Sequence, residues 1–314
     1  MTIGLFLLAL FPGLFWGSIS LLNSKLGGTA AQQTLGMTVG ALVFGWVVTF
    51  AYVLPNHIYF GSKIWILGII SGLFWAVGTA GQFAANKILG VSVSIPISVT
   101  FQLVFNALAA AIILGEWTTA KKWIVGLLSI ALIVAGALLI SAKSKAQKQA
   151  GETLSGLIKG VSILFISNFG YVLYFMFPNL MHKNGFISES IYNAKNGIGY
   201  MTSVVGPQSI GQVIGALLIV IFIFKEKELI FKTPTAKNIL VGLSWGIGNL
   251  FMYIASSNPK IGQAVASTLP QWGVILSAFG GVYLLHEHKD KSQMVKILIG
   301  SLLIVAGAFL IGLS

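Results

Sequence analysis

The chain has 314 residues, of which 56% are hydrophobic and only 8% are charged. Soluble domains carry about 25% charged residues, and 19 basic plus 7 acidic side chains are too few to give a water-soluble globule its polar cover. This composition argues against a soluble enzyme and against a nucleic-acid-binding protein, and it predicts an integral membrane protein.

The formal net charge is +12, and every basic residue is lysine. Guanidinium groups bind phosphate and carboxylate best, so the lack of arginine argues against a phosphorylated or strongly anionic substrate. The chain also has no cysteine, which excludes disulfides, thiol nucleophiles and cysteine-ligated metals. The four histidines fall in or beside predicted loops, where solvated roles are favoured over metal or proton chemistry. We therefore expect no metal ion or other cofactor.

Ten charge-free stretches of at least 18 residues follow one another along the chain. A bilayer core of ~30 Å is crossed by about 20 helical residues, and no strand-like polar alternation persists, so helices are favoured over a membrane barrel. The first stretch lacks the features of a secretory signal and is expected to remain as the first helix. We predict an all-α integral membrane protein with ten transmembrane helices, within residues 2–24, 26–62, 64–86, 88–115, 123–142, 160–182, 196–224, 238–259, 261–286 and 297–314.

The two halves of the chain resemble each other at a nearly constant offset. Two apolar helices can share Gly, Ala and Leu by chance, but a shared Trp and two shared Gly in the same order favour an internal repeat. The matching pairs are Gly72–Gly78 with Gly242–Gly248 at an offset of 170, and Ile133–Ile140 with Ile304–Ile311 and Glu116 with Glu287 at an offset of 171. We therefore divide the chain into a first five-helix repeat (1–141), a linker (142–155) and a second five-helix repeat (156–314).

Five is an odd number of helices, so the two repeats must insert with opposite orientations. Such a 5+5 inverted-topology repeat is typical of transporters, and it places the substrate site near the bilayer midplane, where equivalent helices meet and Pro or Gly interrupts them. Pro96 precedes Gln102 in the fourth predicted helix, and Pro270 directly precedes Gln271 in the ninth. Each proline removes a backbone donor and leaves a carbonyl to be satisfied by protein, water or ligand. Simple packing kinks are the alternative interpretation.

The lysines are distributed unevenly between the two ends of the predicted helices. If the helices alternate in direction, six lysines fall on the side of the chain termini and 19 − 6 = 13 on the side of the linker. The positive-inside rule then places the linker side in the cytoplasm and both termini outside.

No acidic residue falls in the middle of a predicted span. Ionisable residues within membranes usually mark ion or proton pathways, so this pattern favours a neutral cargo and leaves the coupling mechanism open. Glu116 and Glu287 end the fourth and ninth spans and are the best placed candidates for proton coupling. Helix caps or ion pairs with nearby lysines are the alternative roles for both.

Neutral hydrogen-bonding groups and aromatic rings provide the remaining chemistry inside the spans. Amides donate and accept hydrogen bonds as sugar hydroxyls do, and an aromatic face can cover the apolar C–H face of a sugar ring. Interhelical hydrogen bonding or packing explains any single residue equally well, but as a group they favour a polar cavity. The predicted substrate-binding residues are Trp16, Gln82, Gln102, Gln208, Trp245, Asn249 and Gln271.

A series of short motifs runs in order over nearly the whole chain. They are Gly13-Leu-Phe-Trp-Gly-Ser18, Gly90-Val-Ser with Pro96 and Phe101-Gln-Leu103, Leu114-Gly-Glu-Trp117, Pro207-Gln-Ser-Ile-Gly211, Trp245-Gly-Ile-Gly-Asn-Leu-Phe251 and His286-Glu-His-Lys-Asp290. With these motifs the chain resembles the glucose/ribose porter family of sugar uptake proteins, within the drug/metabolite transporter superfamily.

The resemblance implies a multi-pass transporter of the cell membrane that imports a monosaccharide, glucose first and ribose next, by proton symport with alternating access. Its partners would be the monosaccharide, protons and the lipid bilayer. Asn23 and Gln33 also fall on motif-like amides. The chain departs from the family pattern at Leu285-His-Glu287 and at Pro270 beside Gln271. Many relatives of this kind keep both termini inside, in contrast to the lysine distribution.

Other functions fit some of the same observations. Without proton coupling the same fold would act as a facilitator, and the superfamily also includes exporters of small neutral metabolites or amino acids. An intramembrane enzyme acting on lipid-linked substrates would need clustered acids, a His/Asp pair or a metal. The acids of this chain are too few and too scattered for such chemistry, so we expect no enzymatic activity.

Overall fold

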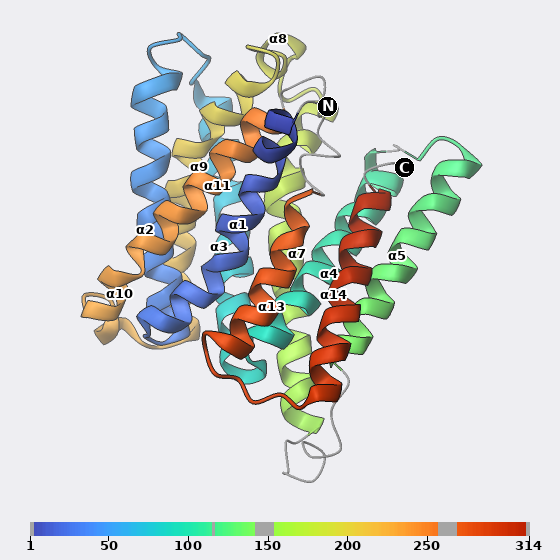
Figure 1. The fold of residues 1–314 in the computed structure, drawn as a ribbon. Helices are drawn as coiled ribbons and strands as arrows, with labels where there is room; N and C mark the ends of the chain where they lie inside the picture. The colour runs from blue at the N-terminus through green and yellow to red at the C-terminus, as the bar shows by residue number, and fades with distance from the viewer. Residues whose placement is uncertain (1–2, 115–116, 142–153, 257–268, 312–314) are drawn as a thin grey trace.

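The computed structural model describes residues 3–114, 117–141, 154–256 and 269–311, and these are helices joined by short connections (Figure 1). The long helices are α1 (Ile3–Leu26), α2 (Ala30–Val48), α3 (Ser62–Leu89), α4 (Val91–Ala109), α5 (Ala120–Ser141), α7 (Leu154–Lys183), α9 (Ile198–Leu218), α11 (Ile239–Ser256), α13 (Gly273–Tyr283) and α14 (Lys291–Ile311). The short ones are α8 (Glu189–Tyr192), α10 (Thr233–Lys237) and the 3₁₀ helix η5 (Leu269–Trp272). The all-helical prediction is confirmed for these residues.

Eight of the described helices are long and apolar enough to cross a bilayer, and they make the chain a multi-pass membrane protein. They comprise α1, α2, α3, α4, α5, α7, α9 and α14, some with an adjoining π-helical turn. The two remaining predicted spans contain α11, which ends at Ser256, and η5 with α13, which begin at Leu269; residues 257–268 between them lie outside the described part of the chain, so ten spans remain a prediction. In the predicted linker, residues 142–153 also lie outside it, and the last two positions are already the start of α7.

The helix pairs of the two halves of the chain largely correspond. The main pairs are α1 with α11 and α13, α2 with α3, α9 and α11, α3 with α4, α7 and α9, α4 with α5, α7 and α13, α5 with α14, α9 with α11, and α13 with α14. When α1 to α5 are exchanged, in order, with α7, α9, α11, α13 and α14, each of these pairs is retained except α3 with α4, because the described residues of α11 and α13 make no comparable contact. In Figure 1, α5 and α14 stand together at one side of the bundle.

Glycines allow the closest approaches between helices. At the crossing of α3 with α9, a Cβ added to Gly72 would lie 2.9 Å from the Cα of Gly211. At the crossing of α2 with α11, a Cβ added to Gly242 would lie 2.7 Å from the Cα of Gly40. Lipid provides no hydrophobic drive for helix association, so backbone-to-backbone contact of this kind supplies the packing energy.

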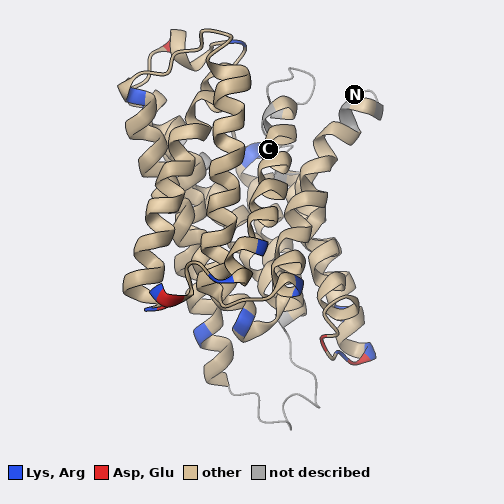
Figure 2. Ribbon diagram, turned by 90° about the vertical axis from the view of Figure 1, so that its left-hand side faces the viewer, with Lys and Arg blue, Asp and Glu red and all other residues tan. Residues whose placement is uncertain are grey.

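Apolar side chains cover the outside of the bundle, and polar ones are buried within it. Phe50, Ile112 and Leu138 are each more than 60% exposed, whereas many Ser, Thr, Asn and Gln side chains are buried. Figure 2 shows lysines gathered mainly at the end of the molecule opposite to the two termini. We call this end, where α1, α3 and α13 finish, the lysine-rich end. The distribution is that of a protein whose solvent is a bilayer.

The glycine crossings predict a strong dependence of stability on residue 72. Gly72→Ala forces a Cβ against the backbone of α9 and should cost about 2 kcal/mol, the scale of overpacking a well-packed interior. The matched control is Gly4→Ala, because nothing lies within 4 Å of a Cβ at that helical position. Thermal unfolding in detergent should show a lower midpoint for Gly72→Ala alone, and equal midpoints would contradict this packing.

Candidate functional site

A cavity of about 210 Å³ lies among helices from both halves of the chain. Typical small-molecule pockets measure about 300–1,000 Å³, so this one suits a small ligand. The lining residues are all uncharged: Trp16, Gly17, Ile19 and Ser20 of α1, Met37 of α2, Trp75, Gln82 and Phe83 of α3, Ile95, Val99, Gln102 and Asn106 of α4, Tyr171, Tyr174 and Phe175 of α7, Trp245, Asn249 and Met252 of α11, Pro270 and Gln271 of η5, and Gly273, Val274 and Ser277 of α13.

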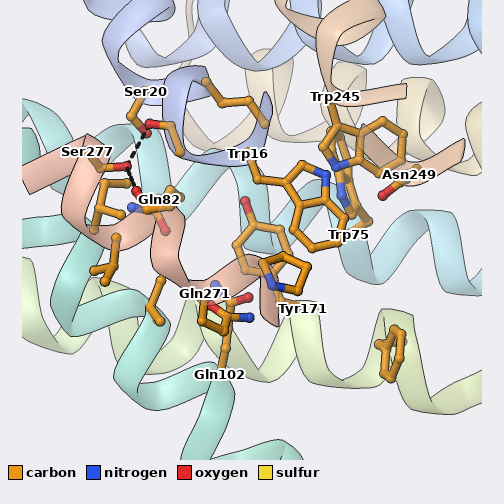
Figure 3. A pocket seen from close by; sticks show the side chains of 18 of the residues that line it. Trp16, Ser20, Trp75, Gln82, Gln102, Tyr171, Trp245, Asn249, Gln271 and Ser277 are labelled. Atoms are coloured by element: carbon orange, nitrogen blue, oxygen red, sulfur yellow. Dashed lines mark hydrogen bonds between the residues drawn. The ribbon is translucent and has the colours of Figure 1, made fainter. Parts of the chain in front are cut away.

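Three tryptophans form an aromatic wall on one side of the cavity (Figure 3). The ring centroids of Trp75 and Trp245 are 4.9 Å apart with a tilt of 56°. These two tryptophans occupy matching positions of the predicted internal repeat, at an offset of 170 residues. The indole of Trp16 reaches α11, where a Cβ on Gly248 would lie 2.8 Å from its Nε1 atom.

Gln102 and Gln271 both line the cavity, although they come from different halves of the chain (Figure 3). The Gln102 amide donates to Ser98 Oγ over 3.3 Å, and Ser98 donates to Asn168 Oδ1 on α7 over 3.0 Å. Gln271 belongs to η5, the 3₁₀ turn that contains Pro270 and precedes α13. This short break, which Pro270 marks, places a polar side chain where the cavity is lined by helix ends.

The position of η5 is fixed against α1. The Trp272 indole donates to the carbonyl of Leu10 over 2.9 Å. A Cβ on Gly13 would collide with the same indole and with the carbonyl of Pro270, so only glycine allows this approach. Gly13, the first residue of its sequence motif, therefore supports the site through packing, whereas Trp16 and Gly17 of the same motif line the cavity.

A buried hydrogen-bonded network centred on Asn86 forms another part of the wall. Gln82 donates to Asn86 Oδ1 over 3.1 Å, and Asn86 donates to Ser20 Oγ over 2.9 Å. Ser94 also donates to Asn86 Oδ1. Since Gln82 and Ser20 line the cavity, Asn86 holds two lining side chains from α1 and α3 in place.

Several buried polar atoms have no hydrogen-bond partner, and three of them belong to lining residues. They are Trp16 Nε1, Asn249 Nδ2 and Asn106 Oδ1, which are two donors and one acceptor. An unsatisfied buried polar group costs about 1–3 kcal/mol. All three atoms are enclosed by protein, so a ligand in the cavity would contact them only after neighbouring side chains shift.

The structure divides the predicted substrate-binding residues into those that line the cavity and one that does not. Six line the cavity, namely Trp16, Gln82, Gln102, Trp245, Asn249 and Gln271. Gln208 does not: its amide donates to Ser71 Oγ over 2.9 Å between α9 and α3, so its position does not support a role in binding. Among residues the sequence interpretation missed, Asn106 is the clearest. It lies four residues after Gln102, a spacing that places both on one helix face.

Of the two proton-coupling candidates, Glu116 falls outside the described residues, and Glu287 does not line the cavity. Glu287 follows α13, where its carboxylate accepts hydrogen bonds from the backbone N–H groups of Val91 and Ser92 at the start of α4. Across the described ranges, no group of three His, Asp or Glu side chains is placed to hold a metal ion.

Replacing two buried amides by leucine should distinguish a ligand-binding amide from a structural one. Gln208→Leu removes the hydrogen bond to Ser71 and should cost about 1–3 kcal/mol of stability. Asn249→Leu replaces an unpartnered Nδ2 by an apolar group of similar shape and should be neutral or stabilising. Thermal unfolding of the ligand-free protein measures both effects, and an equal loss for the two variants would contradict the assignment.

Comparison with known proteins shows extensive similarity to sugar transport proteins. The family described as "Sugar transport protein" matches residues 7–314. A putative sugar uptake protein of Lactiplantibacillus plantarum is 42% identical over 307 residues, and the glucose uptake protein GlcU of Bacillus subtilis is 39% identical over 308 residues. Both alignments cover 98% of this chain and 98% of the relative. A crystal structure that is 15% identical, with a TM-score of 0.58, covers 100% of this chain and 98% of its own and shows a shared fold. The chain belongs to the sugar transport protein family, whose members are membrane transporters and not enzymes.

Proposed function

We propose that the protein imports a monosaccharide through the central cavity, with glucose as the first candidate and ribose as the second. The observation that carries this proposal is an uncharged cavity lined by amide side chains and tryptophans from both halves of the chain. A hydroxyl group both donates and accepts, so a polyhydroxylated ligand suits the amides of Gln82, Gln102 and Gln271.

The rest of the lining supports the same class of ligand. The aromatic wall of Trp16, Trp75 and Trp245 can cover the apolar C–H face of a sugar ring. No charged side chain is found among the lining residues, which favours a neutral ligand over an amino acid with its ammonium and carboxylate groups. Several relatives carry names that refer to sugar or glucose uptake, which supports the choice of cargo and direction.

For the mechanism, we propose alternating access by rocking of two inverted five-helix repeats, residues 1–141 and 156–314. The largely corresponding helix pairs of the two halves support this arrangement. So do the glycine crossings, since Gly72 and Gly211 in one crossing match Gly242 and Gly40 in the other at offsets of 170 and 171. A site between equivalent helices at mid-depth suits such a motion.

Proton symport is the proposed source of energy, with Glu116 and Glu287 as the candidate carriers. Glu287 contacts the first turn of α4, a helix that lines the cavity, so a change in its protonation would change how that helix is held. A facilitator would have the same cavity without this coupling.

Uptake into vesicles tests the proposed function directly. Labelled glucose should accumulate when an inward proton gradient is imposed and only equilibrate without one, with ribose as a weaker competitor. Uptake of neither sugar would refute the proposal, whereas equilibration in both conditions would identify a facilitator and refute the symport step.

Two amide variants test the location of the site. Gln102→Ala and Gln271→Ala should each weaken glucose binding about three- to tenfold, the scale of one neutral hydrogen bond. Gln212→Ala is the matched control, because Gln212 is buried on α9 and does not line the cavity. Equilibrium binding to purified, folded protein is the measurement. Unchanged affinity in both cavity variants would exclude this cavity as the binding site.

A further inference from the structure

A glycine and a proline flank the first turn of α4 and weaken its connection to the neighbouring backbone. Gly90 precedes it with a φ of 75°, a conformation that favours glycine. Pro96 follows it and has no N–H to donate to the carbonyl of Ser92. Residues 91–95 are therefore joined to their neighbours by fewer constraints than a turn inside an unbroken helix.

Glu287 holds this turn from the side of the lysine-rich end. Its Oε1 atom accepts from Val91 N over 2.6 Å, its Oε2 atom accepts from Ser92 N over 3.2 Å, and Ser92 Oγ donates to the same carboxylate. Negative charge is favourable at a helix N-terminus. A Cβ on Gly90 would lie 2.9 Å from Oε2, so glycine also makes room for this contact. The backbone N–H of Glu287 in turn donates to the carbonyl of Gly281 in α13.

The same turn is held from the cavity side by the Asn86 network. Ser94 donates to Asn86, which is bonded to Ser20 and Gln82 of the cavity wall. Ile95, the last residue before Pro96, also lines the cavity. The turn therefore lies between the cavity and the loop that carries Glu287.

We propose that residues 91–95 form a gate between the cavity and the lysine-rich end, and that Glu287 is the latch that keeps this gate closed. This inference rests on the proposed transport function. When the Glu287 contacts break, the turn swings on Gly90 and Pro96, Ile95 leaves the cavity wall, and Ser20 and Gln82 become accessible from that end. Glu287 acts here as a positioning residue, since it does not line the cavity.

Site-directed labelling tests the gate, and the absence of cysteine from the sequence removes any background. Val99→Cys places a reporter on the cavity wall one turn beyond Ile95. Phe231 is 99% exposed in a loop of the lysine-rich end. Labelling of Phe231→Cys therefore shows in which vesicle preparation this end faces the medium. A membrane-impermeant maleimide is then added to vesicles of each orientation.

Glu287→Gln should raise the labelling rate of the Val99→Cys reporter about tenfold from the lysine-rich end, because a charge-assisted contact is lost. Labelling from the opposite end should not rise. Ser92→Ala removes one contact and keeps the carboxylate, so it should give a smaller increase in the labelling rate. This variant provides the test if Glu287→Gln does not fold. Unchanged rates in the folded variants, or an equal increase from both ends, would overturn the gate.

Asp290→Asn is the matched control. It lies three residues beyond Glu287, but its carboxylate accepts from Gln293 N over 2.8 Å at the start of α14. Its labelling rate should match that of the parent, and an increase as large as that of Glu287→Gln would show that any disturbance of this loop opens the cavity, which overturns the latch.

Glucose uptake by the same vesicles separates the two proposals. If the parent transports glucose and Glu287→Gln does not change the labelling rate, the gate alone is refuted. If the parent takes up neither sugar and Glu287→Gln raises the labelling rate from the lysine-rich end only, the proposed cargo is refuted and the gate is supported.

Discussion

Lipid cannot satisfy a polar group, and this constraint governs the whole molecule. Every polar side chain that enters a span must find a partner inside the bundle or leave an unpaired group at a cost of about 1–3 kcal/mol. Many interior hydroxyls bond to a carbonyl of their own helix, as Thr49 does with Gly45, whereas Gln208 and Asn86 are paired across helices with Ser71 and Ser20. Other amides, such as Gln102 and Gln271, line the uncharged cavity instead. The polar groups of the bundle interior therefore divide into those that join helices and those that line the cavity.

The packing divides the molecule into tightly and loosely held parts. Glycine-mediated backbone contacts join α2 to α11 and α3 to α9, and these crossings leave little freedom for the helices concerned. By contrast, α4 contains Pro96 near its start, and Pro270 lies in the 3₁₀ turn η5 just before α13. Both proline-containing segments line the cavity, and α4 contacts α13. A rigid frame beside two segments that lack a proline N–H donor is suited to transport, because a local change can open the site without loss of the frame.

Similar side chains from the two halves of the chain have different surroundings in the cavity wall. Trp75 and Trp245 match in sequence and also meet in the cavity wall. Gln102 and Gln271 both line the cavity, but Gln102 is held by Ser98 on a regular helix and Gln271 lies in a 3₁₀ turn. Unequal surroundings for similar side chains provide the means to bind a ligand in one orientation.

The sequence by itself determined that the chain folds in a bilayer and is helical, because composition and charge spacing report directly on transfer into a bilayer. All but one of the site residues predicted from it line the cavity. It did not determine which way each interior amide points. The spans are apolar all round, so no polar face marks the side that meets the protein interior, and Gln208 and Asn106 are equivalent in such a pattern. Tertiary packing decided between them by giving Gln208 a partner on α3 and leaving Asn106 on the cavity wall. It also decided the position of Glu287, whose partners lie 195 and 196 residues away in sequence and come within reach only when α4 and α13 pack together.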